Sequence, residues 1–259
     1  MATYIGKIWK HKSLAYAFAR RDLKIKFAQT WLGLSWSIVQ PLFATVVYTL
    51  FFTFVVKIPT NDTPYILFVL SGLSLWSLFT YIFSQGVGVL LGNQEVIRKM
   101  AFPKIILPLS KVIVGFLEFL VSFTLFFVAW TIWNLHLDWK LFLILIPIAG
   151  IALFGFALTL LLLTFSIKQR DLLHIGPFLV YFGIWFTPVF YPVSLIPEQF
   201  KDWIYLNPAA GMIDFFRWTT GISASFSNFY IVDFAVILVL FAFSVFLFKN
   251  AEDGIVDNI

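Results

Sequence analysis

The chain has no cysteine and few charged residues. The absence of cysteine excludes disulfides, thiolate metal sites and thiol nucleophiles. Only 12% of the 259 residues are charged, whereas soluble domains carry about 25%. So few charges cannot cover a water-facing surface, and 61% of the residues are hydrophobic. The composition therefore predicts an integral membrane protein.

Motifs for catalysis and metal binding are also missing. No glycine-rich phosphate loop ending in Gly-Lys-Ser/Thr occurs, so we expect no ATP hydrolysis by this chain. The histidines, His11, His136 and His174, lack paired ligand spacing, and the outward-facing segments lack the paired carboxylates of glycosidic chemistry. We therefore expect no enzyme activity, no metal site and no cofactor bound by this chain.

Long apolar runs dominate the sequence instead. Runs such as 34–56, 112–133 and 141–166 approach or exceed the roughly 20 residues needed to cross a hydrocarbon core of about 30 Å. Because these runs do not alternate, they predict helices rather than a closed barrel. We predict an all-α fold, a single transmembrane domain over 1–259 with six transmembrane helices. The predicted spans are 34–57, 65–91, 108–133, 141–167, 172–187 and 230–248.

The basic residues indicate the orientation of these spans. With a cytoplasmic N-terminus, fourteen of the 18 Lys and Arg residues fall on the inner side, including Lys168, Arg170 and Lys249. The outer side keeps Lys57, Lys140, Lys201 and Arg217. This distribution follows the positive-inside rule. It explains the net charge of +5 by topology rather than by nucleic-acid binding, and we expect both termini in the cytoplasm and no signal peptide.

The first 31 residues form a basic leader. Tyr16, Leu23 and Phe27 share one helical face, whereas Phe18 and Ile25 fall off it. We expect an amphipathic helix on the cytoplasmic leaflet, with basic side chains toward anionic headgroups and aromatic rings at the boundary. The residues assigned to this interfacial helix are Arg20, Arg21, Lys24 and Phe27. The alternative is a disordered basic tail.

Two polar features interrupt the apolar pattern before residue 120. Segment 92–107 is too polar to lie in lipid and is expected to form a cytoplasmic helix-turn. Glu118 lies about three turns into the third span, where a carboxylate should face the bundle interior or a hydrated path. Alternatively, Glu118 bonds a Ser or Thr of a neighbouring helix and fixes packing. Lys111 lies about 10 Å away along the axis, so no direct pair is expected.

Segment 188–229 is too aromatic for a simple loop. Pro192, Pro197 and the pair Asn207-Pro208 divide it and predict short helices at 198–206 and 208–219. Each is about half the length needed to cross, so we expect a re-entrant hairpin on the outer face. Its candidate gate residues are Trp203, Asn207, Pro208, Phe215, Phe216 and Trp218, with the four aromatic rings packed together as a seal. The alternative is an amphipathic loop on the outer headgroups.

Three sequence blocks together resemble the permease subunits of type-2 ABC exporters, specifically the Wzm-like polysaccharide exporters. The first is RRDLKIKF at 20–27 with TWLGLSW at 30–36 and Gln40-Pro41. The second is VIRKMAFP at 96–103, and the third runs from TPVFYP at 187–192 to Asn207-Pro208. The similarity covers nearly the whole chain, and each block lies on the side of the membrane that the charges predict.

The resemblance implies a homodimer joined to two copies of a separate ABC ATP-binding subunit, which would hold ATP and Mg. It implies that segment 94–103 is a coupling helix docking on that subunit, with Gln94, Glu95, Arg98, Lys99, Phe102 and Pro103 as its residues. It assigns the gate to 198–219. The implied substrate is a lipid-linked glycan, typically on undecaprenyl diphosphate: O-antigen foremost, otherwise capsule or teichoic acid. The implied location is the inner membrane, among membrane lipids and without nucleic acid.

Two other function classes compete with this interpretation. A drug or lipid exporter of the same superfamily would share the helices, and the three blocks alone favour the glycan branch. A membrane enzyme acting on lipid-linked sugars would need clustered acidic or histidine residues at an interface, and the sequence offers none.

Overall fold

The computed structural model describes residues 2–28, 30–58, 63–133, 138–166, 169, 171–223, 225–252 and 254. Within these ranges every regular element is a helix, which confirms the all-α prediction. His136, Lys168 and Arg170 lie outside the described residues, as does the side chain of Phe27.

In the part of the chain that the structure describes, five helices are long and apolar enough to cross a membrane. The first is α3 (Trp36–Leu50), continued by the π-helical turn η2 (Phe51–Val56). The others are α4 (Tyr65–Val87), α6 (Ile106–Ile132), η4 (Trp139–Leu143) with α7 (Leu145–Ser166), and α11 (Phe229–Ala251). They correspond to five of the six predicted spans, with ends within a few residues of those predicted.

The predicted fifth span is shorter than expected. Its helix α8 (Leu172–Gly183) has 12 residues, about 18 Å at 1.5 Å per residue, which does not cross a hydrocarbon core. After Gly183 the chain turns, and Val189 and Phe190 are fully buried. The carbonyls of Pro188 and Val189 accept hydrogen bonds from Arg217 instead of continuing a helix.

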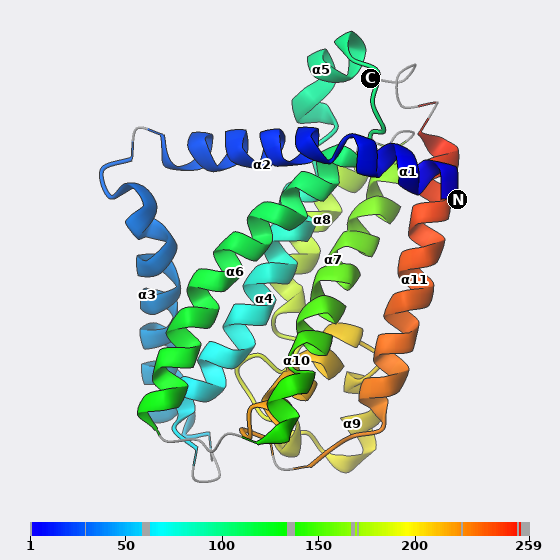
Figure 1. Cartoon of the computed structure of the whole chain (residues 1–259). Coiled ribbons are helices and arrows are strands. Elements are labelled where there is room, and N and C mark those ends of the chain that lie inside the picture. Colours follow the sequence, from blue (N-terminus) through cyan, green and yellow to red (C-terminus); the bar gives the residue numbers. More distant parts are fainter. Residues whose placement is uncertain are drawn as a thin grey trace.

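Helix α4 forms the centre of the bundle. It packs on α3, α6, α7, α8 and α10, and most of its side chains are buried. Small residues allow close helix contacts, because a Cβ on Gly86 would lie 2.5 Å from a methyl carbon of Thr159 in α7. By contrast, α3 lies at the edge of the bundle and is mostly exposed along its length (Figure 1).

The two ends of the bundle differ. At one end, α1 (Ala2–Lys10) and α2 (Lys12–Phe27) lie across the long helices, and η3 (Leu91–Asn93) with α5 (Gln94–Lys99) projects beyond them (Figure 1). We call this the leader end. At the opposite end lie η5 (Val193–Leu195), α9 (Glu198–Ile204) and α10 (Pro208–Thr219). We call this the hairpin end. The short turn η1 (Gly33–Ser35) joins the leader to α3.

Candidate functional site

Both hairpin helices begin where the sequence predicts, and α10 also ends there, whereas α9 ends at Ile204, two residues before its predicted end. Pro208 occupies the first turn of α10, where its missing N–H costs nothing. The side-chain oxygen of Asn207 caps this helix by accepting from Ala209 N at 3.1 Å. Asn207 Nδ2 also donates to Thr187 Oγ1 at 2.9 Å, which ties the break between α9 and α10 to the segment after α8.

The four aromatic residues expected to form one seal are separated in the structure, so that detail was wrong. Phe215 and Trp218 do pack together, with ring centroids 5.9 Å apart. Phe216 points into the core and contacts Phe126 of α6 at 5.3 Å. Trp203 on α9 is 69% exposed. Sequential neighbours on α10 face different sides because a helix turns about 100° per residue.

Arg217 anchors α10 to the bundle. Its side chain is almost completely buried, and its guanidinium lies 3.5 Å from the centre of the Phe68 ring. It donates to Ser71 Oγ at 3.2 Å, to the Phe68 carbonyl at 3.2 Å and to the Val189 carbonyl at 2.8 Å. It also donates to the Pro188 carbonyl. One side chain therefore joins α10, α4 and the turn after α8. From the sequence alone, Arg217 is expected only as a charge on the outer side.

Gly72 makes room for this arginine. A Cβ on Gly72 would lie 2.8 Å from Arg217 Nη2 and 2.7 Å from the Val189 carbonyl oxygen. A second close contact joins α10 and α11, where a Cβ on Gly211 would lie 1.7 Å from Asp233 Oδ2. Asp233 is 2% exposed, and this oxygen has no hydrogen-bond partner among the described residues. The hairpin end thus holds buried polar groups that small residues accommodate.

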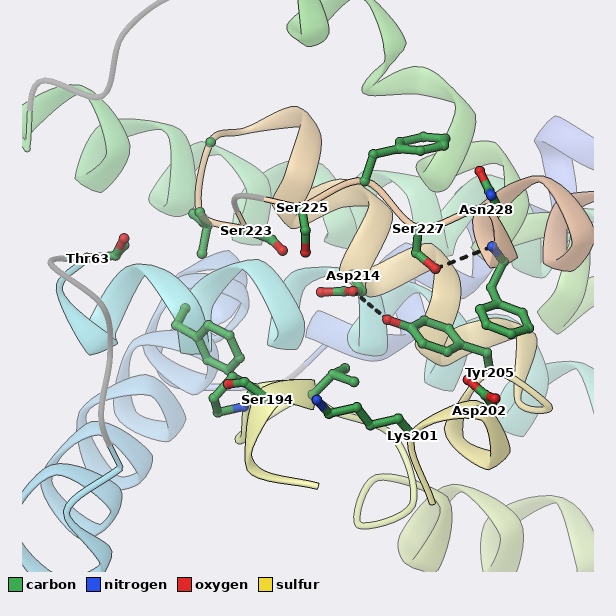
Figure 2. A pocket seen from close by; sticks show the side chains of 17 residues that line it. Thr63, Ser194, Lys201, Asp202, Tyr205, Asp214, Ser223, Ser225, Ser227 and Asn228 are labelled. Carbon is green, nitrogen blue, oxygen red and sulfur yellow. Dashed lines mark hydrogen bonds between the residues drawn. The ribbon is translucent and has the colours of Figure 1, made fainter. Parts of the chain in front are cut away.

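A cavity of about 700 Å³ opens beside α10 at the hairpin end. Figure 2 shows hydroxyl and carboxylate groups converging on it from α9, α10 and the loop before α11. Its polar lining includes Ser194, Lys201, Asp202, Tyr205, Asp214, Ser223, Ser225, Ser227 and Asn228. Such groups can hydrogen-bond water or a sugar.

Asp214 is held at the edge of this cavity by two phenols. Tyr205 and Tyr230 donate to its Oδ2 at 2.9 Å and 2.8 Å. Burial raises the pKa of Tyr205 above its ordinary value, and the negative charge of Asp214 raises it further. Tyr205 therefore stays a neutral donor. Its ring also stacks on Phe229 at 5.0 Å, which joins the turn after α9 to the start of α11.

At the leader end, α2 packs on the bundle through one face. Ala15, Phe18 and Ala19 are buried, whereas Tyr16, on the face expected at the membrane boundary, is 62% exposed. The small Ala15 and Ala19, one turn apart with Phe18, allow close contact with the bundle. Of the assigned basic residues, Arg20 and Lys24 point outward.

Arg21 points toward the bundle instead. It donates to Asn93 Oδ1 at 2.8 Å and pairs with Asp22 at 2.9 Å. The leader is thereby linked to η3, the turn that precedes α5.

Two ion pairs connect α2 with α6. Lys111 Nζ lies 2.6 Å from Asp22 Oδ2, and both side chains are nearly buried. Lys26 pairs with Glu118 about two turns further along α6. Glu118 therefore contacts the leader rather than a Ser or Thr of a neighbouring span. As expected, Lys111 and Glu118 form no pair with each other among the described ion pairs.

The predicted coupling residues fall into two groups. Glu95 and Lys99 have side chains 88% and 76% exposed and form an i,i+4 pair of 3.7 Å, and Arg98 is also exposed. Gln94 is half-buried. Phe102 and Pro103 are buried, with the Phe102 ring 6.0 Å from Phe18 of α2. These two residues hold the segment on the leader and do not form part of its exposed surface, which corrects their assignment.

Comparisons with a family model and with known proteins agree with one another. A family model described as ABC-2 type transporter matches residues 14–220. A relative named O-antigen export system permease protein RfbA, from Klebsiella pneumoniae, is 28% identical over 202 residues, 77% of each chain. A second Klebsiella pneumoniae protein of the same name is 27% identical over 77% of each chain. A protein of that name from Myxococcus xanthus is 26% identical over 82% of each chain.

Proposed function

The chain belongs to the ABC-2 type transporter family, and on this premise we propose that it exports a lipid-linked polysaccharide outward across the cytoplasmic membrane. The observation that carries the proposal is the match to relatives named O-antigen export permeases over 77–82% of the chain. We propose O-antigen as the first candidate cargo, ahead of capsule or teichoic acid.

The energy for export comes from a partner. Membrane components of this family work with an ABC ATP-binding subunit and have no catalytic activity of their own. We propose two permease copies and two ATP-binding subunits, with ATP and Mg held by the latter. Because α4, α6 and α7 pack tightly within one copy, we place the glycan path between the two copies.

The leader end is the cytoplasmic end in this proposal. It carries the basic leader and α5, and the C-terminal part of α11 lies there as well. Helices α1 and α2 then lie on the inner leaflet, with Arg20 and Lys24 toward its headgroups. Both termini are cytoplasmic, as the positive-inside distribution requires.

The hairpin end is then the outer end, and its helices form the gate. In this proposal α8 and the turn after it make an incomplete fifth span, which α9 and α10 complete by re-entering from outside. Irregular backbone at membrane depth is tolerated where it packs on protein, and Arg217 supplies partners for the carbonyls of that turn.

The two gate helices have different mobility in this proposal. Helix α10 is fixed, because most of its residues are buried and Arg217 holds it to α4. Helix α9 has no buried residue and carries the exposed Trp203. We therefore assign gate opening to α9, with Phe215 and Trp218 as the fixed wall.

A genetic replacement tests the proposed function. Deleting the chain should leave its lipid-linked glycan on the cytoplasmic side and remove the polymer from the cell surface. The intact chain expressed with its ATP-binding subunit should restore the polymer. Unchanged surface polymer in the deletion strain, together with a changed sensitivity to drugs, would instead indicate a drug or lipid exporter of the same family.

A further inference from the structure

A second large cavity lies at the leader end, far from the hairpin cavity. It has a volume of about 690 Å³ and is walled by three segments distant in sequence. Tyr4, Lys7, Lys10 and His11 come from the leader, Ala101 to Lys104 from the segment after α5, and Lys249 and Glu252 from the end of α11. Figure 1 shows α1 beside the C-terminal part of α11 at this corner.

The lining of this cavity is strongly basic. Four lysines, Lys7, Lys10, Lys104 and Lys249, face one carboxylate, Glu252. Both oxygens of Glu252 are already used: Tyr4 donates to Oε2 at 2.7 Å, and the backbone N–H of Lys104 donates to Oε1. Burial raises the pKa of Tyr4, and the hydrogen bond to Glu252 raises it further, so this phenol remains a donor.

The lysines lack carboxylate partners where the structure describes the chain. The ion pairs of that part include none of the four. Lys104 is 7% exposed, and its ammonium donates to the Phe102 carbonyl at 3.1 Å and lies 4.8 Å from the Phe102 ring. Lys249 lies over the Tyr4 ring at 5.8 Å. A buried ammonium with three donors and one carbonyl acceptor is poorly compensated without an anion.

We propose that this cavity binds a phosphate-bearing anion. Lysine ammonium groups bind phosphate as point charges, and the volume lies within the usual range for small-ligand sites. The wall formed by α1 and the end of the apolar α11 lies where the headgroups of a leaflet would be, so an anionic lipid headgroup is the first source. A soluble phosphate compound offers the same chemistry.

The bound anion would link the leader, the segment that follows α5 and the last helix. It would screen the repulsion among the lysines and hold these three segments together next to α5. The inference stands independently of the cargo, because it rests only on charge and geometry at the leader end.

The test measures thermal stability of the full chain in nanodiscs. In the lipid arm, phosphatidylcholine nanodiscs contain rising fractions of phosphatidylglycerol. In the soluble arm, inorganic phosphate or pyrophosphate is added to pure phosphatidylcholine nanodiscs. The variant is K10Q/K249Q, whose lysines are not deeply buried, and the matched control is K140Q/K201Q, which removes two lysines at the hairpin end.

We expect phosphatidylglycerol to raise the melting temperature of the wild type and of K140Q/K201Q by several degrees. K10Q/K249Q should lose at least half of that rise, and native mass spectrometry should show at least fivefold less retained phosphatidylglycerol. If phosphate or pyrophosphate alone raises the melting temperature of the wild type but not of K10Q/K249Q, that result would support the site and assign it to a soluble ligand. Equal responses of K10Q/K249Q and wild type in both arms would overturn the proposal. None of these outcomes depends on export.

Discussion

Arg217 places a full positive charge inside the protein and satisfies it mostly with backbone oxygens. Its acceptors are Ser71 Oγ and the carbonyls of Phe68, Pro188 and Val189. Backbone carbonyls are strong acceptors, and the planar guanidinium offers five donors that reach several of them at once. Among the described residues, the arrangement fixes α10 without a carboxylate paired to Arg217.

Replacing Arg217 with methionine should destabilise the protein by about 3 kcal/mol or more, because several buried acceptors lose their donor together. Lysine should restore only part of the lost stability, since its ammonium cannot donate to several acceptors at once as the planar guanidinium does. The measurement is thermal unfolding of the purified chain. The exposed-helix variant Lys201→Met is the control, and a melting temperature of Arg217→Met equal to that of the control would refute the anchoring role.

Gly211 and Asp233 form a second testable contact. Gly211→Ala should cost about 2 kcal/mol of stability, because the new methyl group would overlap the Asp233 carboxylate. In the background of Asp233→Ala the same substitution should cost little stability, since the carboxylate that it would overlap has been removed. A double-mutant cycle in thermal unfolding measures this coupling. Additive effects would show that the introduced methyl group does not contact the Asp233 side chain.

The sequence predicts some of these residues and misses others for identifiable reasons. Glu118 was selected because it interrupts an apolar span, and the same rule applied to the last span would have selected Asp233. Arg217 lies in the last turn of a short aromatic helix and looks like an outer charge. Its burial depends on Gly72 and on the turn at Pro188, which are distant in sequence. No local pattern carries that information.

At the scale of elements, the leader is held on α6 by charge. Lys26→Glu or Glu118→Lys alone should bring like charges together and loosen α2, whereas the double swap should recover the attraction. Because both side chains are partly exposed, we expect a coupling energy of only about 1 kcal/mol.

Thermal unfolding and export of the three variants check this coupling. Lys57→Glu, which reverses an exposed lysine after η2, is the charge control and should behave as wild type. If the double swap is as impaired as the worse single variant, the pair does not hold the leader.

Helix α5 presents charge at the leader end, where we place the ATP-binding subunit. Reversing Arg98 and Lys99 to Glu should weaken docking about tenfold and uncouple ATP hydrolysis from export, because interface charges govern association and register. Co-purification and ATPase assays measure the effect. Lys140→Glu at the hairpin end is the charge control. Full recovery of the complex with normal export would contradict the docking role.

The buried part of the same segment should behave differently. Phe102→Ala should lower the stability of the permease itself, because its ring packs on Phe18. The sequence grouped Phe102 and Pro103 with the charged residues because they are adjacent in the chain. Burial separates them, and burial depends on where α2 lies.

Helix boundaries were well predicted where apolar runs and prolines decide them. Five spans and both hairpin helices follow from run length and from Asn207-Pro208. The fifth helix is shorter than its apolar run, which continues past Gly183, because the backbone there turns to meet Arg217. Hydropathy counts side chains and cannot detect a long-range partner for backbone carbonyls.

At the scale of the whole molecule, the two ends suit a transporter powered from one side. The leader end gathers basic residues, α5 and a lysine-lined cavity. The hairpin end gathers a hydroxyl-lined cavity and the α10 anchor. The bundle around α4 connects the two ends. Movement at the leader end can therefore reach the hairpin end through packed helices.

Glycan export can be measured in inverted membrane vesicles containing the chain and its ATP-binding subunit. We predict ATP-dependent entry of lipid-linked O-antigen polysaccharide into the vesicle lumen. This entry should be lost when the permease is omitted and at least tenfold slower with Arg98 and Lys99 reversed to Glu. Glycan entry that continues at the same rate without the permease would contradict the proposed export function.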